Sequence, residues 1–202
     1  MTSQMHHSIS NRPMFIVVMG VSGTGKSTLG QALATELGMP FLDGDSLHPK
    51  ANIDKMSAGH PLTDADRAPW LALIRSTVEN MDREQQHQPI SMGSRPGVVV
   101  ACSALKRGYR DVLRGGESSK ATGSDRLPTY FVFLEGTKET LVGRMQNRRG
   151  HFMKSSMLES QLEALESPRG EDGVVVVSVE DTPSDQLRAV VAGLELCCQS
   201  NA

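Results

Sequence analysis

The chain has 202 residues with 38% apolar and 22% charged content, which are ordinary values for a globular protein of one domain. Its formal net charge of -2 gives no reason to expect nucleic acid or an anionic membrane as a partner. Its apolar runs are far shorter than the ~20 residues that span a bilayer, and three cysteines are too few for a disulfide framework, so we expect a protein of the cytoplasm.

Five short apolar runs predict strands that are buried on both faces, as in a parallel sheet. They cover residues 14–19, 40–42, 98–102, 129–134 and 173–179. Helical patterns separate them. Strands that alternate with helices predict an α/β fold of three layers, with right-handed crossovers between the parallel strands.

The helical patterns have recognisable ends. In the first, apolar residues recur at helical spacing up to Leu37, and Gly38 stands where a helix ends. The second contains Trp70 and begins either at a capping box of Thr63 and Asp66 or near Pro69.

Two later helices are predicted from their first residues. Thr137 is a candidate cap for the helix after the fourth predicted strand, and Thr182 with Pro183 and Asp185 marks the start of the last helix.

Two stretches interrupt this alternation. Residues 83–97 and 115–128 are rich in Gln, Ser, Gly and charge, which predicts long surface loops. The first thirteen residues are polar and lack the apolar stretch of a signal peptide. We therefore divide the chain into a polar arm over residues 1–13 and one domain over residues 14–202.

The segment from Gly20 to Ser27 reads GVSGTGKS and matches the whole phosphate-binding pattern G-x-x-x-x-G-K-[ST]. Its glycines let successive backbone N–H groups face an anion at the start of the following helix. Lys26 is expected to reach the outer phosphates, and the Ser27 hydroxyl to ligate Mg²⁺. Because the motif follows a predicted strand and opens a predicted helix, it predicts a site for a nucleoside triphosphate. The residues expected to hold the nucleotide here are Gly20, Ser22, Gly23, Thr24, Gly25, Lys26, Ser27 and Thr28.

The rest of the chain narrows the nucleotide class and supplies candidate carboxylates. We find no N-K-x-D guanine signature, and the strand over residues 98–102 ends without the aspartate that often assists the metal. Asp43 and Asp45 flank Gly44 directly after the second strand, at the end where α/β folds bind ligands. Asp43 is therefore expected to serve the metal and Asp45 the acceptor hydroxyl. The alternative is that this trio is an ordinary turn.

A series of short motifs then becomes recognisable. It comprises residues 20–27, 41–45, 47–49, 52–53, 55–56, 59, 61–62, 64, 66–67, 69–71, 102–106, 109–111, 113–114, 150–152, 154, 157–158, 161, 165–166 and 168. In this order and with a residue as rare as Trp70, the chain resembles the gluconokinase family, relatives of shikimate kinase and of the nucleoside monophosphate kinases. The resemblance runs from about Phe15 to the last helix. The two long loops and the N-terminal arm depart from it, and they lie between or outside the motifs.

This resemblance implies transfer of the γ-phosphoryl group of ATP to the 6-hydroxyl of D-gluconate, with a product that feeds the pentose phosphate pathway. It also implies an adenylate-kinase-like core with a mobile lid, and often a homodimer. The acceptor-binding helices would lie at about residues 46–82. The residues expected to bind gluconate are Asp45, His48, Asn52, Lys55, Arg67, Ser103, Lys106, Arg110 and His151, and those expected to catalyse transfer are Lys26, Asp45, Lys106 and Arg148.

Several of these residues have a plainer reading. Each polar residue between Asp45 and Trp70 is individually more often a solvated surface residue. His48 precedes a proline and suits a turn or cap, Arg110 could pair with neighbouring acids, and Trp70 is more typical of a core residue than of a ligand contact.

The densest basic cluster of the chain contains Arg144, Arg148 and Arg149, followed by His151 and Lys154. Arg144 and Arg148 are four residues apart and so share one face of a helix. We predict a lid over about residues 144–156 whose Arg144 and Arg148 contact the triphosphate. A solvated basic face is the alternative.

Two other functions remain open from the sequence. One is a kinase of another small acid or of a nucleotide on the same scaffold, although shikimate kinase has a glycine triplet where this chain has Cys102, Ser103 and Ala104. The other is a nucleotide-binding protein without turnover, against which the intact Lys26 and Asp45 argue.

Overall fold

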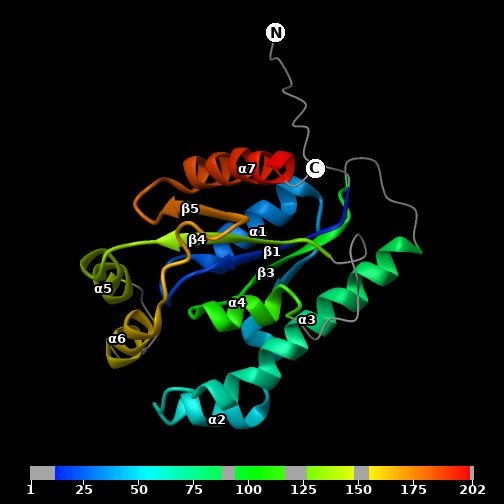
Figure 1. The fold of residues 1–202 in the computed structure, drawn as a ribbon. Helices are drawn as coiled ribbons and strands as arrows, with labels where there is room; N and C mark the ends of the chain where they lie inside the picture. Colours follow the sequence, from blue (N-terminus) through cyan, green and yellow to red (C-terminus); the bar gives the residue numbers. More distant parts are fainter. Residues whose placement is uncertain (1–11, 88–93, 117–126, 148–154, 201–202) are drawn as a thin grey trace.

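The computed structural model describes residues 12–87, 94–116, 127–147 and 155–200 (Figure 1). Five parallel strands form one sheet in the order β2-β3-β1-β4-β5. The strands are β1 (Met14–Met19), β2 (Phe41–Asp43), β3 (Gly97–Ala101), β4 (Thr129–Glu135) and β5 (Val174–Ser178). The α-helices are α1 (Lys26–Leu37), α2 (Lys50–Ser57), α3 (Asp64–Gln86), α4 (Arg107–Leu113), α5 (Lys138–Asn147), α6 (Ser155–Ala164) and α7 (Pro183–Ser200), and a short 3₁₀ helix, η1, spans Gly44–Leu47. All five predicted strands are confirmed to within one or two residues.

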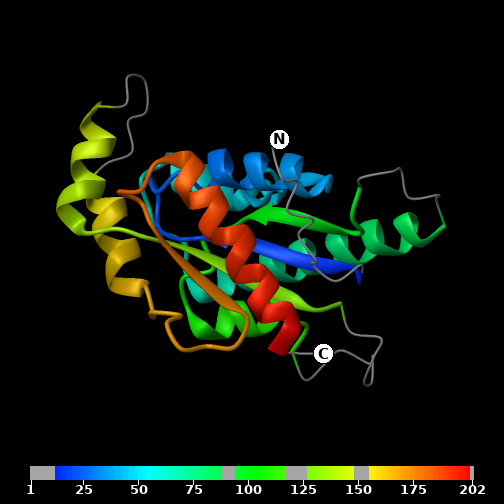
Figure 2. The same cartoon turned by 90° about the horizontal axis from the view of Figure 1, so that it is seen from above.

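The side chains of the central strand β1 alternate between two cores, which gives the molecule its three layers. Ile16 and Val18 pack into the core that α1 and α7 cover, whereas Phe15 and Val17 pack into the core that α3 and α4 cover. All six residues of β1 are buried, as expected for an inner strand of a parallel sheet. Figures 1 and 2 show α1 and α7 on one face, α3 and α4 on the other, and α5 and α6 beside the ends of β4 and β5.

The predicted helix ends are confirmed where they were specific. Gly38 closes α1 in the left-handed conformation with φ 64°. Thr63 and Asp66 form the capping box of α3, so Pro69 lies inside this helix and does not begin it. Thr182 caps α7, since its hydroxyl oxygen accepts a hydrogen bond of 3.2 Å from the Asp185 amide.

One predicted loop begins later than the sequence indicated. Helix α3 continues to Gln86, so residues 83–86 are helical and not part of the loop predicted over 83–97. The side chain of Gln85 explains the extension, because it bonds both the N–H (2.8 Å) and the C=O (3.1 Å) of Gly97. This contact satisfies the backbone at the start of β3 and ties the end of α3 to it.

The carboxyl ends of the three neighbouring strands β2, β3 and β1 meet at one edge of the sheet. The phosphate-binding loop follows β1, Asp43 ends β2, and Ser103 follows β3. The Gly20 amide donates to the Ser103 carbonyl at 3.3 Å, which joins two of these ends directly. Within the part of the chain that the structure describes, no helix has both the length and the apolar character needed to cross a membrane.

Candidate active site

The loop from Gly20 to Lys26 has the backbone conformation of an anion-binding turn. Gly20, Gly23 and Gly25 have φ angles of 143°, 83° and 96°, values that favour glycine. A Cβ atom at Gly20 would lie 2.9 Å from the Leu134 carbonyl oxygen, so this position requires glycine also for space. Because α1 begins directly at Lys26, the positive end of its dipole faces the loop.

Two side chains of this loop lie against the end of β2. The Ser27 hydroxyl donates to Asp43 Oδ2 at 3.0 Å, so a hydroxyl and a carboxylate oxygen lie together beside the loop. The Lys26 ammonium group donates to the Val21 carbonyl at 3.0 Å. Burial lowers the pKa of Lys26, and the nearby Asp45 opposes this shift.

The acidic pair that follows β2 is held in a fixed turn. Asp43 caps η1, because its Oδ1 accepts from the Asp45 amide at 3.1 Å. Gly44 packs so closely against β3 that a Cβ atom would lie 2.7 Å from the Ala101 carbonyl oxygen. The Asp45 side chain, 76% exposed, projects from this turn toward solvent. The structure therefore separates a carboxylate that faces Ser27 from one that is open to a ligand.

The side chain of His48 is buried beside Asp45. It is 5% exposed, and its ring stacks on the indole of Trp70 with centroids 4.0 Å apart. Trp70 Nε1 donates to the Gly44 carbonyl at 2.8 Å, so one side chain contacts both the turn and the histidine. Burial lowers the pKa of His48, which Asp45 opposes and Arg67 reinforces. Trp70 is a core residue, as its residue type indicated, and it also supports the site.

Two of the residues expected to bind the acceptor have partners within the protein. Asn52 is buried, and its amide nitrogen donates to the Asp66 carbonyl at 2.9 Å. Lys55 forms an ion pair of 2.6 Å with Asp66 Oδ2, the carboxylate of the α3 capping box. Hydrogen bonds from Lys55 and then Thr63 hold the pKa of Asp66 far below its usual range. These contacts lock α2 onto the start of α3.

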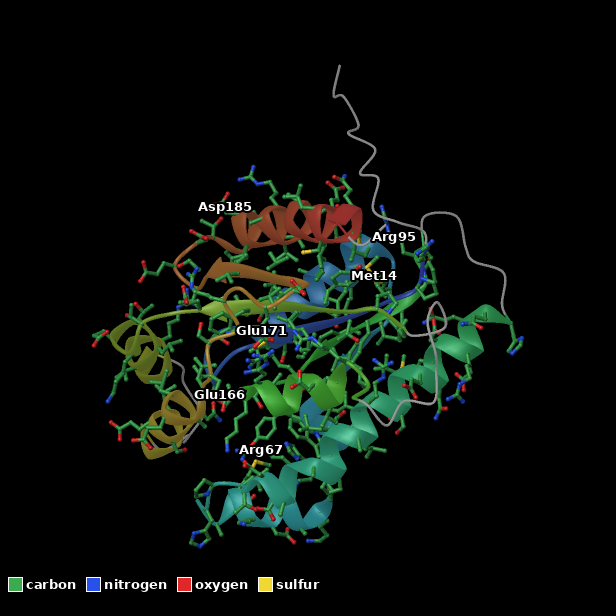
Figure 3. The ribbon with its side chains drawn as sticks, viewed as in Figure 1. Met14, Arg67, Arg95, Glu166, Glu171 and Asp185 are labelled. Atoms are coloured by element: carbon green, nitrogen blue, oxygen red, sulfur yellow. The ribbon has the colours of Figure 1, made fainter. Side chains whose placement is uncertain are left out.

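A cluster that the sequence did not predict lies around Tyr109. Lys106 Nζ donates to both carboxylate oxygens of Asp64 at 2.8 Å, and the Tyr109 hydroxyl donates to the same group. The charged groups of Arg67 and Lys106 each lie 5.7 Å from the centre of the Tyr109 ring. Arg67 lies on the face of the sheet opposite Asp185 (Figure 3). Asp64 is one of the motif residues that resemble the gluconokinase family, but nothing in the sequence indicated that it pairs with Lys106 and Tyr109.

Arg110 lies in the interior. It is fully buried, and its guanidinium donates to Glu171, to the Ala104 carbonyl and to the Leu105 carbonyl, the last two at 3.0 Å. Ala104 has φ 44°, an uncommon value for a residue with a side chain. Arg110 therefore braces the segment between Ser103 and Lys106, and the structure gives it no exposed surface for contact with an acceptor.

On the lid side the structure describes Arg144 but not Arg148, Arg149, His151 or Lys154, which lie outside the described residues. Arg144 is exposed on α5 and its guanidinium donates to the Val179 carbonyl after β5. Gln161 of α6 reaches the phosphate-binding loop, where its Oε1 accepts from the Ser22 amide at 2.7 Å. This contact was not foreseen, because nothing in the sequence relates residues 139 positions apart.

The chain is similar to known kinases over most of its length. The model of the shikimate kinase family matches residues 22–186. The gluconokinase of Gluconobacter oxydans is 48% identical over 180 residues, covering 89% of this chain and 90% of that protein. The thermosensitive gluconokinase of Escherichia coli is 41% identical over 160 residues, covering 79% of this chain and 75% of that protein.

Solved structures give the same picture. A gluconokinase from Sinorhizobium meliloti superposes with a TM-score of 0.75 at 47% identity, covering 94% of this chain and 95% of that one. The APS kinase of Mycobacterium tuberculosis, solved with AMPPNP and APS, has a TM-score of 0.60 at 17% identity, covering 91% of this chain and 98% of that one. The second likeness is one of fold alone.

Proposed function

The chain belongs to the shikimate kinase family, in which its relatives of 38–48% identity are gluconokinases or probable gluconokinases, and from this we propose that it phosphorylates D-gluconate with ATP. One observation carries the proposal. The likeness to gluconokinases covers most of the chain and includes the elements that bring the phosphate-binding loop, the acidic pair and Lys106 to one edge of the sheet. The products would be 6-phospho-D-gluconate and ADP.

ATP would bind along the phosphate-binding loop. Backbone N–H groups between Gly20 and Ser27 would hold the phosphates, and the Lys26 ammonium would exchange the Val21 carbonyl for phosphate oxygens. We place the closing lid over residues 144–156, with Arg144 and Arg148 over the triphosphate. Gln161 of α6 already contacts the phosphate-binding loop at the Ser22 amide, so this part of the chain lies beside the proposed triphosphate site.

The metal site that we propose consists of Ser27 and Asp43. Their oxygens lie 3.0 Å apart, and hard oxygen ligands suit Mg²⁺. Across the described ranges there is no group of three or more His, Cys, Asp or Glu side chains that would cage a metal ion. Mg²⁺ keeps several waters and is typically held by few protein ligands together with substrate phosphates. Bound there, the ion would neutralise charge on the outer phosphates.

Asp45 would act on the acceptor. Its exposed carboxylate accepts the proton of the 6-hydroxyl as this oxygen attacks the γ-phosphorus and the bond to the leaving ADP oxygen breaks. Arg67 and Lys106, whose charged groups both lie near the Tyr109 ring, would supply the positive charge that the carboxylate of a sugar acid requires. Lys106 would leave Asp64 to do so. A homodimer and a location in the cytoplasm stay predictions.

A panel assay tests the function. ADP release is measured with D-gluconate, other aldonates, shikimate and nucleoside monophosphates, and the product is identified by phosphorus NMR. We expect gluconate to give the highest kcat/KM and phosphate to appear on its 6-oxygen. A higher kcat/KM with shikimate or a nucleoside monophosphate would refute the proposal.

A further inference from the structure

The contacts of His48 define which of its ring nitrogens carries the proton. The Asn52 side-chain atom that faces the Asp66 carbonyl at 2.9 Å must be the NH₂ group, because a carbonyl oxygen only accepts hydrogen bonds. The same Asn52 nitrogen lies 3.4 Å from His48 Nδ1, and an NH₂ group can only donate. Nδ1 is therefore the acceptor of the neutral ring, and the proton is on Nε2.

The protonated nitrogen faces Asp45. His48 Nε2 and Asp45 Oδ1 lie 4.0 Å apart, too far for a direct hydrogen bond. Two hydrogen bonds of ~2.8 Å that meet at one oxygen span this distance at an angle of roughly 90°. A donor and an acceptor at this separation suit a hydroxyl group, which accepts from the one and donates to the other.

Trp70 supports both members of this pair. The indole stacks on the His48 ring with an interplanar angle of 17°, and its N–H bonds the carbonyl of Gly44, the residue before Asp45. Gly44 itself is packed against the end of β3. Trp70 thus holds the His48 ring and the backbone from which the Asp45 side chain projects, and the exposed Asp45 carboxylate can turn to meet a ligand beside Nε2.

We propose that His48 and Asp45 together read the 5-hydroxyl of gluconate, with Asn52 and Trp70 as positioning residues. This inference rests on the proposed function, in which Asp45 takes the 6-hydroxyl. A carboxylate has two oxygens, and the hydroxyls on carbons 5 and 6 are neighbours in the acceptor. If Oδ2 serves the 6-hydroxyl, Oδ1 and His48 Nε2 bind the 5-hydroxyl. The configuration at carbon 5 therefore decides whether the acceptor fits.

His48→Phe is the direct test, because it keeps an aromatic ring against Trp70 and removes the N–H group. Wild type and variant are assayed with gluconate and with 5-deoxygluconate. We expect the variant to lose about tenfold or more in kcat/KM for gluconate, since a hydroxyl would lose its buried donor. Its kcat/KM for 5-deoxygluconate and its KM for ATP should equal those of the wild type. Equal losses with both acceptors, or no loss with gluconate, would overturn the proposal.

The proton position gives a second test that does not depend on folding of a variant. Nitrogen-15 NMR of the wild-type imidazoles should show His48 with its proton on Nε2.

In Asn52→Asp the new carboxylate draws the proton to Nδ1, and the kcat/KM for gluconate should fall as in His48→Phe. Leu196→Ala, at an exposed position on α7, is the control and should behave as wild type. A proton on His48 Nδ1 in the wild type would refute the inference. A wild type that does not phosphorylate gluconate would instead refute the proposed function.

Discussion

Arg110→Ala should lower the free energy of unfolding by about 3–5 kcal/mol, the usual cost of removing one partner of a buried ion pair. The Arg110 side chain is 0% exposed and Glu171 is 14% exposed, so the remaining carboxylate would be largely desolvated. Although burial opposes it, hydrogen bonds from Arg110 and Arg114 lower the pKa of Glu171, as expected for a carboxylate kept ionised in the interior.

Two further contributions set where in this range the value falls. The Ala104 and Leu105 carbonyls would each lose a donor, which adds to the loss. Arg114 donates to Glu171 at 2.9 Å, and because this contact should persist in the variant, it limits the loss of stability. At ~2–4 °C per kcal/mol for a domain of this size, the melting temperature should fall by about 6–20 °C.

The loss of stability is measured by urea denaturation monitored by circular dichroism, and the slope m is compared between variants. Arg114→Ala is the matched control, since its side chain is 27% exposed and pairs with the same carboxylate, and it should lose only about 1 kcal/mol. The double variant Arg110→Met with Glu171→Met should recover much of the stability, because the buried charges are both removed and Arg114, which loses Glu171, keeps its ion pair with Asp111. A loss below about 1 kcal/mol for Arg110→Ala would refute the bracing role. A stable variant with a raised KM for gluconate would favour the acceptor contact predicted from sequence.

The remaining predictions concern the nucleotide, the metal, the lid and pH. Lys26→Ala should abolish transfer to gluconate and keep a cooperative thermal melt, since the side chain compensates phosphate charge; near-normal kcat would contradict the role of the loop. Asp43→Asn should raise the Mg²⁺ concentration needed for half-maximal rate. Asp45→Asn should leave that concentration unchanged and lower kcat/KM for gluconate, and exchanged phenotypes would reverse the two roles. Arg148→Ala should lower kcat more than tenfold with a smaller effect on ATP binding, and an unchanged kcat would return the basic cluster to a solvated face. Burial places the pKa of His48 below its unfolded value of about 6.5, so the unfolded chain binds more protons than the folded chain as the pH falls past this value. The free energy of unfolding of the wild type, relative to that of His48→Phe, should therefore decrease as the pH is lowered from 8 to 5 in urea titrations. A difference that stays constant with pH would show that His48 titrates normally.

The sequence by itself determined the parts of this protein that depend on local patterns. Short apolar runs predicted all five strands because both faces of an inner parallel strand are buried, and the glycines of residues 20–27 predicted the phosphate-binding loop because only they allow its backbone angles. The capping residues Thr63 and Thr182 were readable for the same reason, since each acts on an amide three residues away. The family, too, could be identified from the order of its motifs.

Only the tertiary structure decided what each polar side chain near the site does. Lys55 and Arg110 suited an acceptor pocket by charge and spacing, yet their partners Asp66 and Glu171 lie 11 and 61 residues away along the chain. The stack of Trp70 on His48 and the contact of Gln161 with the phosphate-binding loop are likewise long-range. A side chain pairs its charge or hydrogen bonds with whichever partner the fold brings within about 3 Å, and residue type and spacing do not record that distance.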